Sequence, residues 1–493
     1  MSTIKKLAGQ TAIYGLSSII GRLLNYLLVP LHTSEKYGFN KADFGIISEY
    51  YAYVAFFIVL LTFGMETTFF RFVNKSEDKE KTFNQAASIV ILLSAVFLVA
   101  VIAFSQSIAN WIGYPDQQNF VIWFGAILAV DATTSLFLAK LRFQNKAKKF
   151  ALVQLSSIAV NILLNVIFLF GFYDPQHPEA SIGIGFVFLA NLIASFVKPL
   201  FLFKEVSMYR FIWDKALSKA MFIFALPLAL AGFAGIINET LDRILLKRLL
   251  LQDGLIYAQE QVGIYSANYK LSILITLFIQ AFRYAAEPFF FAQEKNENKD
   301  KVYSKVMTYF IIVVSLMFLV ISLNLHIFKW FIPNEAFHEG LKVVPILLLA
   351  NMCLGIYYNQ SIWYKLANKT IYGAYIAVGG AVVTVALNIV LIPILGYVGS
   401  AWTTLAAYFS MMVASHYFGQ KIYPIKYNLR KAALYIVSAL ILFFIGWMIH
   451  LESFWASTIL SIILILVFVA LVFFMEQPIK EFRKNRGPNS DNS

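Results

Sequence analysis

A few ionisable side chains lie inside long apolar runs, and they are the residues of this chain that could carry chemistry. They are Arg22, Glu49, Glu66, Asp131, Asp242, Arg243 and Lys270. An ionisable group at bilayer depth costs at least about 2.5–3.5 kcal/mol on insertion scales, so it usually faces a hydrated cavity or an opposite charge. Each of them is therefore a candidate for a hydrated path or for a buried ion pair.

Arg22 belongs to a stripe of small and polar residues. Gly15, Ser18, Arg22 and Asn25 recur at helical spacing, which places them on one face of a helix. Such a stripe can simply hold helices together. An arginine near its centre favours a hydrated lumen instead, with Ser18 and Asn25 as further polar lumen residues.

Lys270 and Arg243 are the other candidate cations. Lys270 lies one to two turns into its helix, where it either faces the lumen or reaches out to the membrane interface. Asn268 is assigned to the lumen with it. Arg243 follows Asp242 near the outer end of another helix, where a local ion pair or an interface anchor is the alternative.

Four carboxylates are weak candidates for ion coupling or gating, namely Glu49, Glu66, Asp131 and Asp242. Asp131 has no obvious partner, so it is either a proton or cation site or a hydrogen-bonded structural residue. Glu66 is expected to pair with Arg71, about a turn further on. A structural role is therefore favoured for Glu66, and it is favoured for Glu49 as well.

The chain offers no pattern for an active site or a metal centre. Its six histidines are scattered and its single cysteine, Cys353, lies in an apolar run. Nucleophile motifs are absent, and the loops near 106–119 and 173–182 contain no Lys or Arg. We therefore predict that the chain is not an enzyme and uses no cofactor and no metal.

The composition predicts an all-α polytopic membrane protein. Hydrophobic residues make up 59% of the 493 residues and charged residues only 14%, against about 25% in soluble proteins. About 20 apolar residues cross a bilayer. On that basis we predict about fourteen transmembrane helices, near 11–31, 44–69, 86–105, 120–140, 150–172, 183–203, 220–244, 262–282, 306–323, 342–361, 372–394, 399–418, 432–450 and 454–475.

The positive charges alternate between the predicted loops. Of the 40 Lys and Arg residues, 31 fall on the face that carries both termini, seven fall on the other face, and two lie inside spans. Cytoplasmic loops carry the excess of Lys and Arg, so we predict that both termini are cytoplasmic. This bias also accounts for the net charge of +13 without a nucleic-acid partner.

Two sequence echoes indicate an internal duplication. Gly45-Ile46-Ile47-Ser48-Glu49-Tyr50-Tyr51 returns as Gly263-Ile264-Tyr265-Ser266-Ala267-Asn268-Tyr269, and Asn165 before an apolar run returns as Asn388. Six helices is an even number, so both halves insert the same way up, with a substrate path between them. We expect a six-helix bundle at 1–203, a cytoplasmic amphipathic linker or irregular basic loop at 204–219, a second six-helix bundle at 220–420, helices 13 and 14 at 421–476, and a basic cytoplasmic tail at 477–493.

The order of these features resembles the polysaccharide transporters, the oligosaccharide flippases of the multidrug/oligosaccharidyl-lipid/polysaccharide (MOP) superfamily. The likeness covers essentially the whole chain. It rests on Gly64-Met65-Glu66 with Arg71, Leu226-Pro227-Leu228 with Leu241-Asp242-Arg243, Gly263-Ile264-Tyr265-Ser266, Asn388 with Leu391-Ile392-Pro393 and Gly396, and Gly399-Ser400-Ala401.

The resemblance implies two bundles in a V that alternate around a central cavity in a bacterial cytoplasmic (inner) membrane. It implies transfer of undecaprenyl-diphosphate-linked oligosaccharides from the inner to the outer leaflet, with Arg22, Lys270 and Arg243 holding the diphosphate. Helices 13 and 14 would line a groove for the lipid tail. Membrane lipids and a polysaccharide polymerase or glycosyltransferases are the implied partners.

Two other functions stay open at this point. One is a cation-coupled exporter of small amphipathic drugs from the same superfamily. The other is a non-transporting scaffold for a glycan-assembly complex, which would have no need of a mid-span Arg22. The first two helices hold fewer interior arginines than the lipid II flippase branch tends to show, so export of a peptidoglycan precursor is less favoured.

Overall fold

The protein is all-helical, as the sequence predicts. The computed structural model describes residues 15, 17, 19–294, 297–449, 451 and 453–476, and this part of the chain contains helices and no strands. The first half contains Ile19–His32 (ending in α2, Leu28–His32), α3 (Lys41–Thr62), α4 (Met65–Val73), α5 (Lys79–Ala103), α6 (Ser105–Ile112), α7 (Gln118–Phe143), α8 (Ala147–Gly171), α9 (Gly185–Phe201) and α10 (Phe203–Ser207). The rest contains α11 (Lys215–Leu250), α12 (Leu255–Gln293), α13 (Lys299–Leu323), α14 (Leu325–Phe328), α15 (Val344–Gln360), α16 (Ile362–Leu366), α17 (Ile371–Leu395), α18 (Tyr397–Ile422), α19 (Leu429–Met448) and α20 (Phe454–Glu476). Short 3-10 helices are Pro178–Ala180, Leu251–Asp253, Lys329–Phe331 and Glu335–Val343.

Eleven helices of the described chain are long and apolar enough to cross a membrane. Ile19–His32 and Gly185–Phe201 are shorter apolar helices. The 26-residue helix α18 is long enough but is not among the eleven. The class of polytopic membrane protein is therefore confirmed, while the count of fourteen stays a prediction.

The second predicted span is broken. The sequence predicts one helix over 44–69, but α3 ends at Thr62 and α4 begins at Met65. Phe63 and Gly64 between them have φ angles of 46° and 64°. Two successive residues in the left-handed region interrupt a right-handed helix, and the apolar pattern of the segment did not reveal this break.

The connection between the two predicted halves contains a segment without helix. Within the predicted linker 204–219, α10 ends at Ser207 and the chain has no helix from Met208 to Asp214. Asp214 then caps α11 by accepting from the backbone N–H of Leu217, and it forms an ion pair of 2.9 Å with Lys81 of α5. The start of α11 is thus fixed to the first half of the chain.

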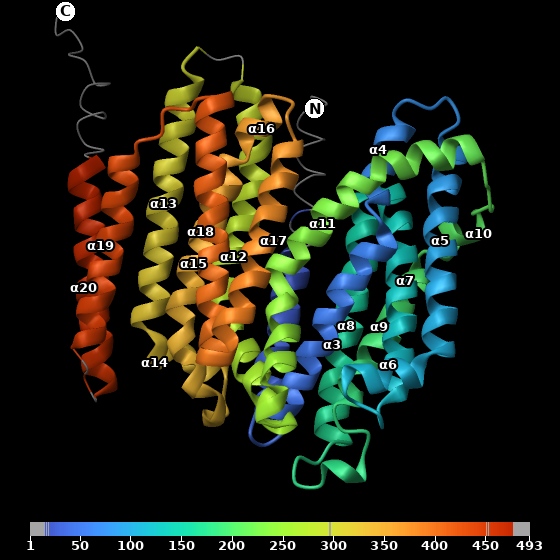
Figure 1. Ribbon diagram of the computed structural model, residues 1–493, viewed down its shortest axis with the longest axis horizontal. Helices are drawn as coiled ribbons and strands as arrows, with labels where there is room; N and C mark the ends of the chain where they lie inside the picture. The colour runs from blue at the N-terminus through green and yellow to red at the C-terminus, as the bar shows by residue number, and fades with distance from the viewer. Residues whose placement is uncertain are drawn as a thin grey trace, which may run out of the picture.

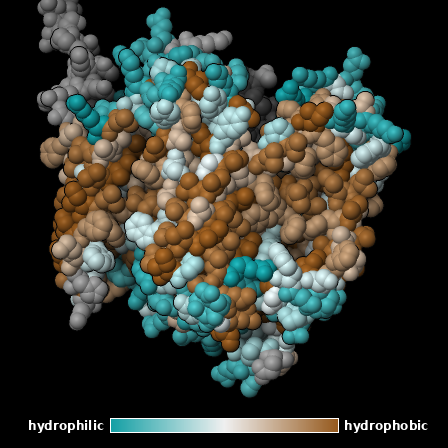
Figure 2. Space-filling model, in the orientation of Figure 1, coloured by the Kyte–Doolittle hydropathy of each residue, from teal (hydrophilic) through white to brown (hydrophobic). Residues whose placement is uncertain are grey.

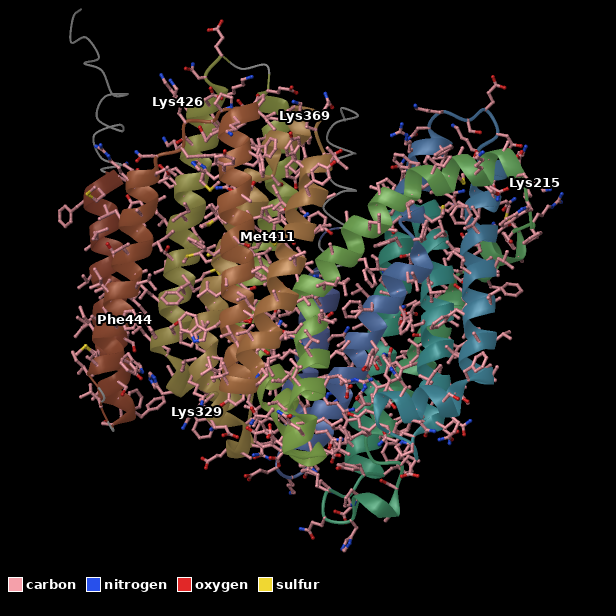
Figure 3. The ribbon with its side chains drawn as sticks, in the orientation of Figure 1. Lys215, Lys329, Lys369, Met411, Lys426 and Phe444 are labelled. Carbon is pink, nitrogen blue, oxygen red and sulfur yellow. The ribbon has the colours of Figure 1, made fainter. Side chains whose placement is uncertain are left out.

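Figure 1 shows the helices in two groups with α11 crossing between them. Helices α3–α10 lie on one side, α12–α18 on the other, and α19 and α20 pack at the outer edge beside α13. Figure 2 shows a broad hydrophobic band between hydrophilic ends. Figure 3 places Lys215, Lys369 and Lys426 at one end, called here the terminal face because α20 ends there, and Lys329 at the opposite, distal face.

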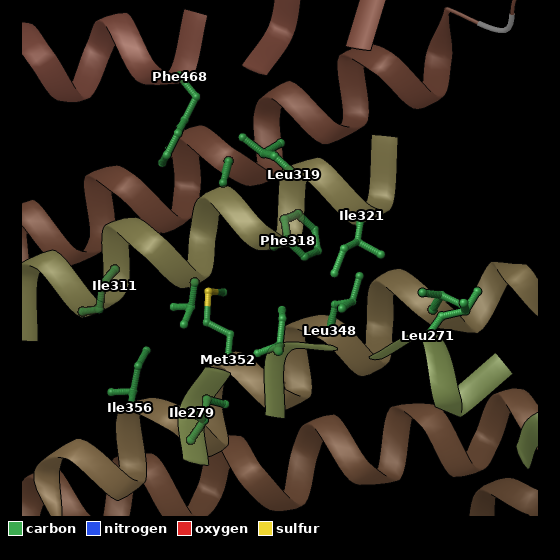
Figure 4. Packing of buried hydrophobic residues seen from close by; sticks show 14 of the residues in the cluster. Leu271, Ile279, Ile311, Phe318, Leu319, Ile321, Leu348, Met352, Ile356 and Phe468 are labelled. Atoms are coloured by element: carbon green, nitrogen blue, oxygen red, sulfur yellow. The ribbon is translucent and has the colours of Figure 1, made fainter. Parts of the chain in front are cut away.

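A shared core fixes α19 and α20 to the second group. Figure 4 shows Leu271 and Ile279 of α12, Phe318 of α13, Met352 of α15 and Phe468 of α20 in this core. The first group has its own core, which includes Phe69, Phe83 and Phe137. Phe44 of α3 also belongs to the core of the second group, so the two groups pack against each other there.

Candidate functional site

A cavity of about 390 Å³ lies between the two groups of helices. Four helical segments line most of it, namely Ile19–His32, α3, α11 and α12, and α8 and α9 contribute one residue each. Three of the predicted site residues meet in it, namely Asn25, Arg243 and Lys270.

The cationic wall of the cavity comes from α11 and α12. The Arg243 guanidinium donates to the Glu239 carbonyl oxygen (2.8 Å), pairs with Asp242 (2.9 Å) and lies over the Tyr269 ring (4.4 Å). Lys270 has no carboxylate within ion-pair distance among the described residues. The Glu239 carboxylate, exposed in this wall, acts electrostatically on both cations.

The opposite wall offers amides, a histidine and a tyrosine. His32 Nε2 and the Asn165 side-chain oxygen are 2.8 Å apart, and the Asn191 amide donates to the Tyr51 hydroxyl at 3.0 Å. Asn25 and Asn161 also line the cavity. Uncharged donors and acceptors of this kind suit hydroxyl-rich ligands.

The cavity is closed toward the distal face by the two repeated glycines. A Cβ atom added to Gly45 of α3 would overlap the Gln259 carbonyl oxygen, and one added to Gly263 of α12 would overlap the Lys41 carbonyl oxygen. The two helices therefore touch backbone to backbone, which only glycine permits. The repeat-related motifs predicted from the sequence thus meet each other at the contact between the halves.

An ion pair seals the same end. Glu49 of α3 and Lys247 of α11 are 2.8 Å apart and almost completely buried. Lys247 also donates to the Ile112 carbonyl oxygen (2.6 Å), and the Tyr114 hydroxyl donates to Glu49 (2.5 Å). We call Glu49, Lys247 and Tyr114 the distal latch. The sequence placed Lys247 in an outer loop and offered no sign of this partner.

Arg22 lies away from this cavity, in a second cationic region. Its side chain is exposed, and together with Arg283 of α12 it acts electrostatically on Tyr358 of α15. Arg283 lies over the Tyr358 ring at 4.1 Å. Arg283 lies thirteen residues beyond Lys270, which is about 20 Å along α12 toward the terminal face. We call Arg22, Arg283 and Tyr358 the inner cluster, after this position nearer the terminal face.

The remaining predicted carboxylates have partners that the sequence did not indicate. Asp131 pairs with Lys198 of α9 at 2.8 Å. Glu66 pairs with Arg142 of α7, and not with the expected Arg71, whose guanidinium lies over the Phe224 ring. These pairs join helices that are distant in sequence, so helical spacing alone could not identify them.

Asp242 and Asn268 are held by contacts with nearby residues of α11, α12 and the segment around Phe337. Asp242 is held by Arg243 and by the Tyr265 hydroxyl, which donates to it at 2.6 Å. Asn268 is completely buried and donates to the carbonyl oxygens of Ile264 and Phe337, so it lies inside the second half and not in the lumen. Ser18 lies outside the described residues.

Sequence reasoning missed Glu239, Arg283 and Asn191. Glu239 lies one helical turn before Asp242 and Arg243, and this spacing places it on the same face of the helix. Arg283 was assigned to a loop because the predicted span ends at residue 282, whereas α12 runs on to Gln293. Asn191 sits in an apolar run without any distinguishing motif.

Solved structures share this fold. The chain resembles the lipid II flippase MurJ in an inward closed conformation, with a TM-score of 0.71, 13% identity, and 93% of this chain and 98% of that chain covered. It also resembles a multidrug resistance MATE family transporter of the MOP superfamily in an inward-facing conformation, with a TM-score of 0.61, 14% identity, and coverage of 84% and 95%. The fold that the resemblance implied is thus confirmed.

Sequence comparison agrees with the structural likeness. The chain is 22% identical over 417 residues to Lsg locus putative protein 1 of Haemophilus influenzae, which covers 80% of this chain and 95% of that protein. Residues 7–293, more than half of the chain, match the family model of polysaccharide biosynthesis proteins. The chain therefore belongs to the polysaccharide biosynthesis protein family.

Proposed function

We propose that this protein moves a diphosphate-linked lipid oligosaccharide across the membrane by alternating access. The observation that carries the proposal is the cavity between the halves, which presents Arg243 and Lys270 on one wall and amide groups on the other. Cations suit a diphosphate away from bulk water, and amides suit a glycan. The family and the fold support the same function.

The charge distribution supports loading from the terminal face. That face carries the excess of Lys and Arg, which is typical of the cytoplasmic side. The distal end is closed by the Gly45–Gly263 contact and by the distal latch. We therefore infer that the substrate is loaded from the inner leaflet and released to the outer leaflet once the latch has parted.

The two cationic regions suggest a path for the diphosphate. The inner cluster with Arg22 and Arg283 would receive it first, and Arg243 and Lys270 would hold it deeper in the cavity. Charges in the deep site balance in the present state, because Asp242 and Glu239 stand against Arg243 and Lys270. A dianionic group that binds there would compete with the Glu239 carboxylate for these two cations.

The lipid tail would occupy an apolar groove outside the cavity. A groove of about 570 Å³ runs between α13, α15, α18, α19 and α20, and its lining includes Phe318, Trp402, Phe443, Phe444 and Trp447. Apolar area removed from water stabilises a hydrocarbon chain by about 25 cal/mol per Å². This groove is the place that the resemblance leads us to expect for the tail.

Reconstituted liposomes test the proposal. Wild-type protein should move a fluorescent undecaprenyl-diphosphate sugar between leaflets, and Lys270→Gln should slow this movement while the protein stays folded. Lys369→Gln serves as the matched control, because this exposed lysine lies at the terminal face away from the cavity. Wild-type liposomes that extrude a cationic dye but leave the lipid-linked sugar in place would favour a drug exporter, and liposomes that move neither compound would favour a scaffold.

A further inference from the structure

A polar cavity at the terminal face shares no lining residue with the candidate site. It has a volume of about 610 Å³ and lies between the start of α13, the α18–α19 connection and the end of α20. Its lining contains four lysines, namely Lys301, Lys305, Lys426 and Lys431, and three carboxylates, namely Glu297, Asp300 and Glu476. The cavity is therefore rich in charged groups, with lysines in the majority.

Its carboxylates do not neutralise all of these lysines. Glu476 is occupied by Lys431 at 2.8 Å and by the Tyr435 hydroxyl at 2.5 Å. Within the described chain, no carboxylate lies within ion-pair distance of Lys301 or Lys426. These two ammonium groups are available to an anion that enters the cavity.

An apolar groove of about 320 Å³ continues from this cavity toward the middle of the protein. The two spaces share Thr308 and Asn428. Met307, Ile311 and Ile436 are among the apolar residues that line the groove. A cationic mouth that opens into an apolar groove fits an amphipathic anion with a hydrocarbon chain.

Three buried polar atoms in the groove have no hydrogen-bond partner among the described residues. They are Gln360 Oε1, His416 Nδ1 and the Tyr427 hydroxyl. A buried polar group left unpaired is destabilising, and several in one groove call for an explanation. A ligand with oxygen atoms at this depth would satisfy them.

We infer that this amphipathic site between α13, α18 and α19 binds an anionic glycerophospholipid. Its phosphate would lie between Lys301 and Lys426, its ester and glycerol oxygens beside Tyr427, Gln360 and His416, and an acyl chain along the groove. The lipid would fasten α19 to α13 and α18. This role is separate from the transport of the lipid-linked sugar.

The unpaired atoms favour a glycerophospholipid over a polyprenyl diphosphate. In a glycerophospholipid, the glycerol and two ester groups lie directly beneath the phosphate. In a polyprenyl diphosphate, the hydrocarbon begins immediately after the diphosphate and would leave Tyr427 and His416 unpaired. The chemistry of the groove therefore points to a membrane phospholipid.

Thermal unfolding of the purified full chain in detergent, titrated with phosphatidylglycerol or phosphatidylcholine, tests the site. Phosphatidylglycerol should raise the unfolding temperature of the wild type, whereas phosphatidylcholine should have little effect. Lys301→Gln and Lys426→Gln should each weaken the apparent affinity for phosphatidylglycerol by about tenfold, because each removes a charge-assisted hydrogen bond. Lys369→Gln, the same change at the same face, should respond like the wild type.

Tyr427→Phe gives an independent measurement that does not alter the charge. Without lipid it should be at least as stable as the wild type, because it removes an unpaired hydroxyl. With phosphatidylglycerol its gain in unfolding temperature should be smaller than that of the wild type. Equal gains with both lipids, an equal loss of affinity in Lys369→Gln, or displacement of phosphatidylglycerol by undecaprenyl diphosphate would each overturn the inference, whatever the outcome of the transport assay.

Discussion

The Lys247 ammonium group lies 2.8 Å from the Glu49 carboxylate, with 3% and 1% of the two side chains exposed. Glu49 belongs to α3 and Lys247 to the far end of α11, so the pair ties the two halves together at the distal face. Desolvating both charges is costly, and a partner left alone is more costly still. Opening of the distal end would therefore have to separate this pair and hydrate both charges.

Removing one charge of the distal latch should be more harmful than removing both. We expect Lys247→Met to lower the free energy of unfolding by about 3–5 kcal/mol, because it leaves Glu49 buried and unpaired. Adding Glu49→Gln should restore much of this loss. Thermal or denaturant unfolding of the two single variants and the double variant gives the coupling energy directly.

Arg248→Gln is the matched control for this cycle. Arg248 is the next residue on α11 and donates to the Trp111 carbonyl oxygen, but this bond is exposed. Its loss should change the free energy of unfolding by no more than about 0.5–1 kcal/mol. A loss for Lys247→Met no larger than that for Arg248→Gln would show that the buried pair adds nothing to the closed state.

Gly45→Ala should open the distal end without removing any charge. The new Cβ overlaps the Gln259 backbone carbonyl, and backbone cannot give way as a flexible side chain can. We expect α3 and α12 to separate. Spin labels at Asn40 and Tyr257, two exposed distal positions, should report a longer mean distance in a Cys353→Ser background.

Gly235→Ala makes the same substitution where there is space. A Cβ atom at Gly235 of α11 meets no atom within 4 Å. The distance between the labels should therefore stay at the wild-type value. Similar distances in Gly45→Ala and Gly235→Ala would mean that close approach of the glycines does not hold the distal end shut.

The sequence predicted a repeat but not the contact that the repeated glycines make. Gly45 and Gly263 take the same place in the two copies of the predicted motif, and such a match is a pattern along the chain. Asn165 and Asn388 behave equivalently as well, since each donates its side-chain amide to the carbonyl oxygen four residues earlier. That the two glycines meet across the halves is a tertiary fact that no local pattern encodes.

Ion pairs between different helices could not be predicted from the sequence. A window of helical spacing identifies a partner one turn away, and for that reason Glu66 was assigned to Arg71. Its actual partner, Arg142, lies on another helix, and so do the partners of Asp131 and Glu49. The sequence therefore identified several of the charges inside helices, although not Lys247, and it indicated the local pair of Asp242 and Arg243. The pairs between helices required the fold.

Glu239→Gln should strengthen diphosphate binding at the deep site. The Glu239 carboxylate acts electrostatically on Arg243 and Lys270, so it repels an anion that takes these two cations. Removing its charge should therefore raise the affinity for a diphosphate. Titrating purified wild-type protein and Glu239→Gln with undecaprenyl diphosphate measures this change; equal or weaker binding in Glu239→Gln would show that Glu239 does not compete for the two cations.

Arg283→Gln should impair loading more than translocation. Arg283 lies over the Tyr358 ring in the inner cluster, about 20 Å along α12 from Lys270. A residue that contacts the diphosphate only at the start of the path contributes to capture from the inner leaflet and little to the later crossing. In liposomes, Arg283→Gln should therefore raise the substrate concentration for half-maximal transport and leave the maximal rate nearly unchanged, whereas Lys270→Gln should lower the maximal rate. Lys329→Gln, at the distal face, should change neither quantity. A lower maximal rate for Arg283→Gln, with the half-saturation concentration unchanged, would place Arg283 in the translocation step instead of the loading step.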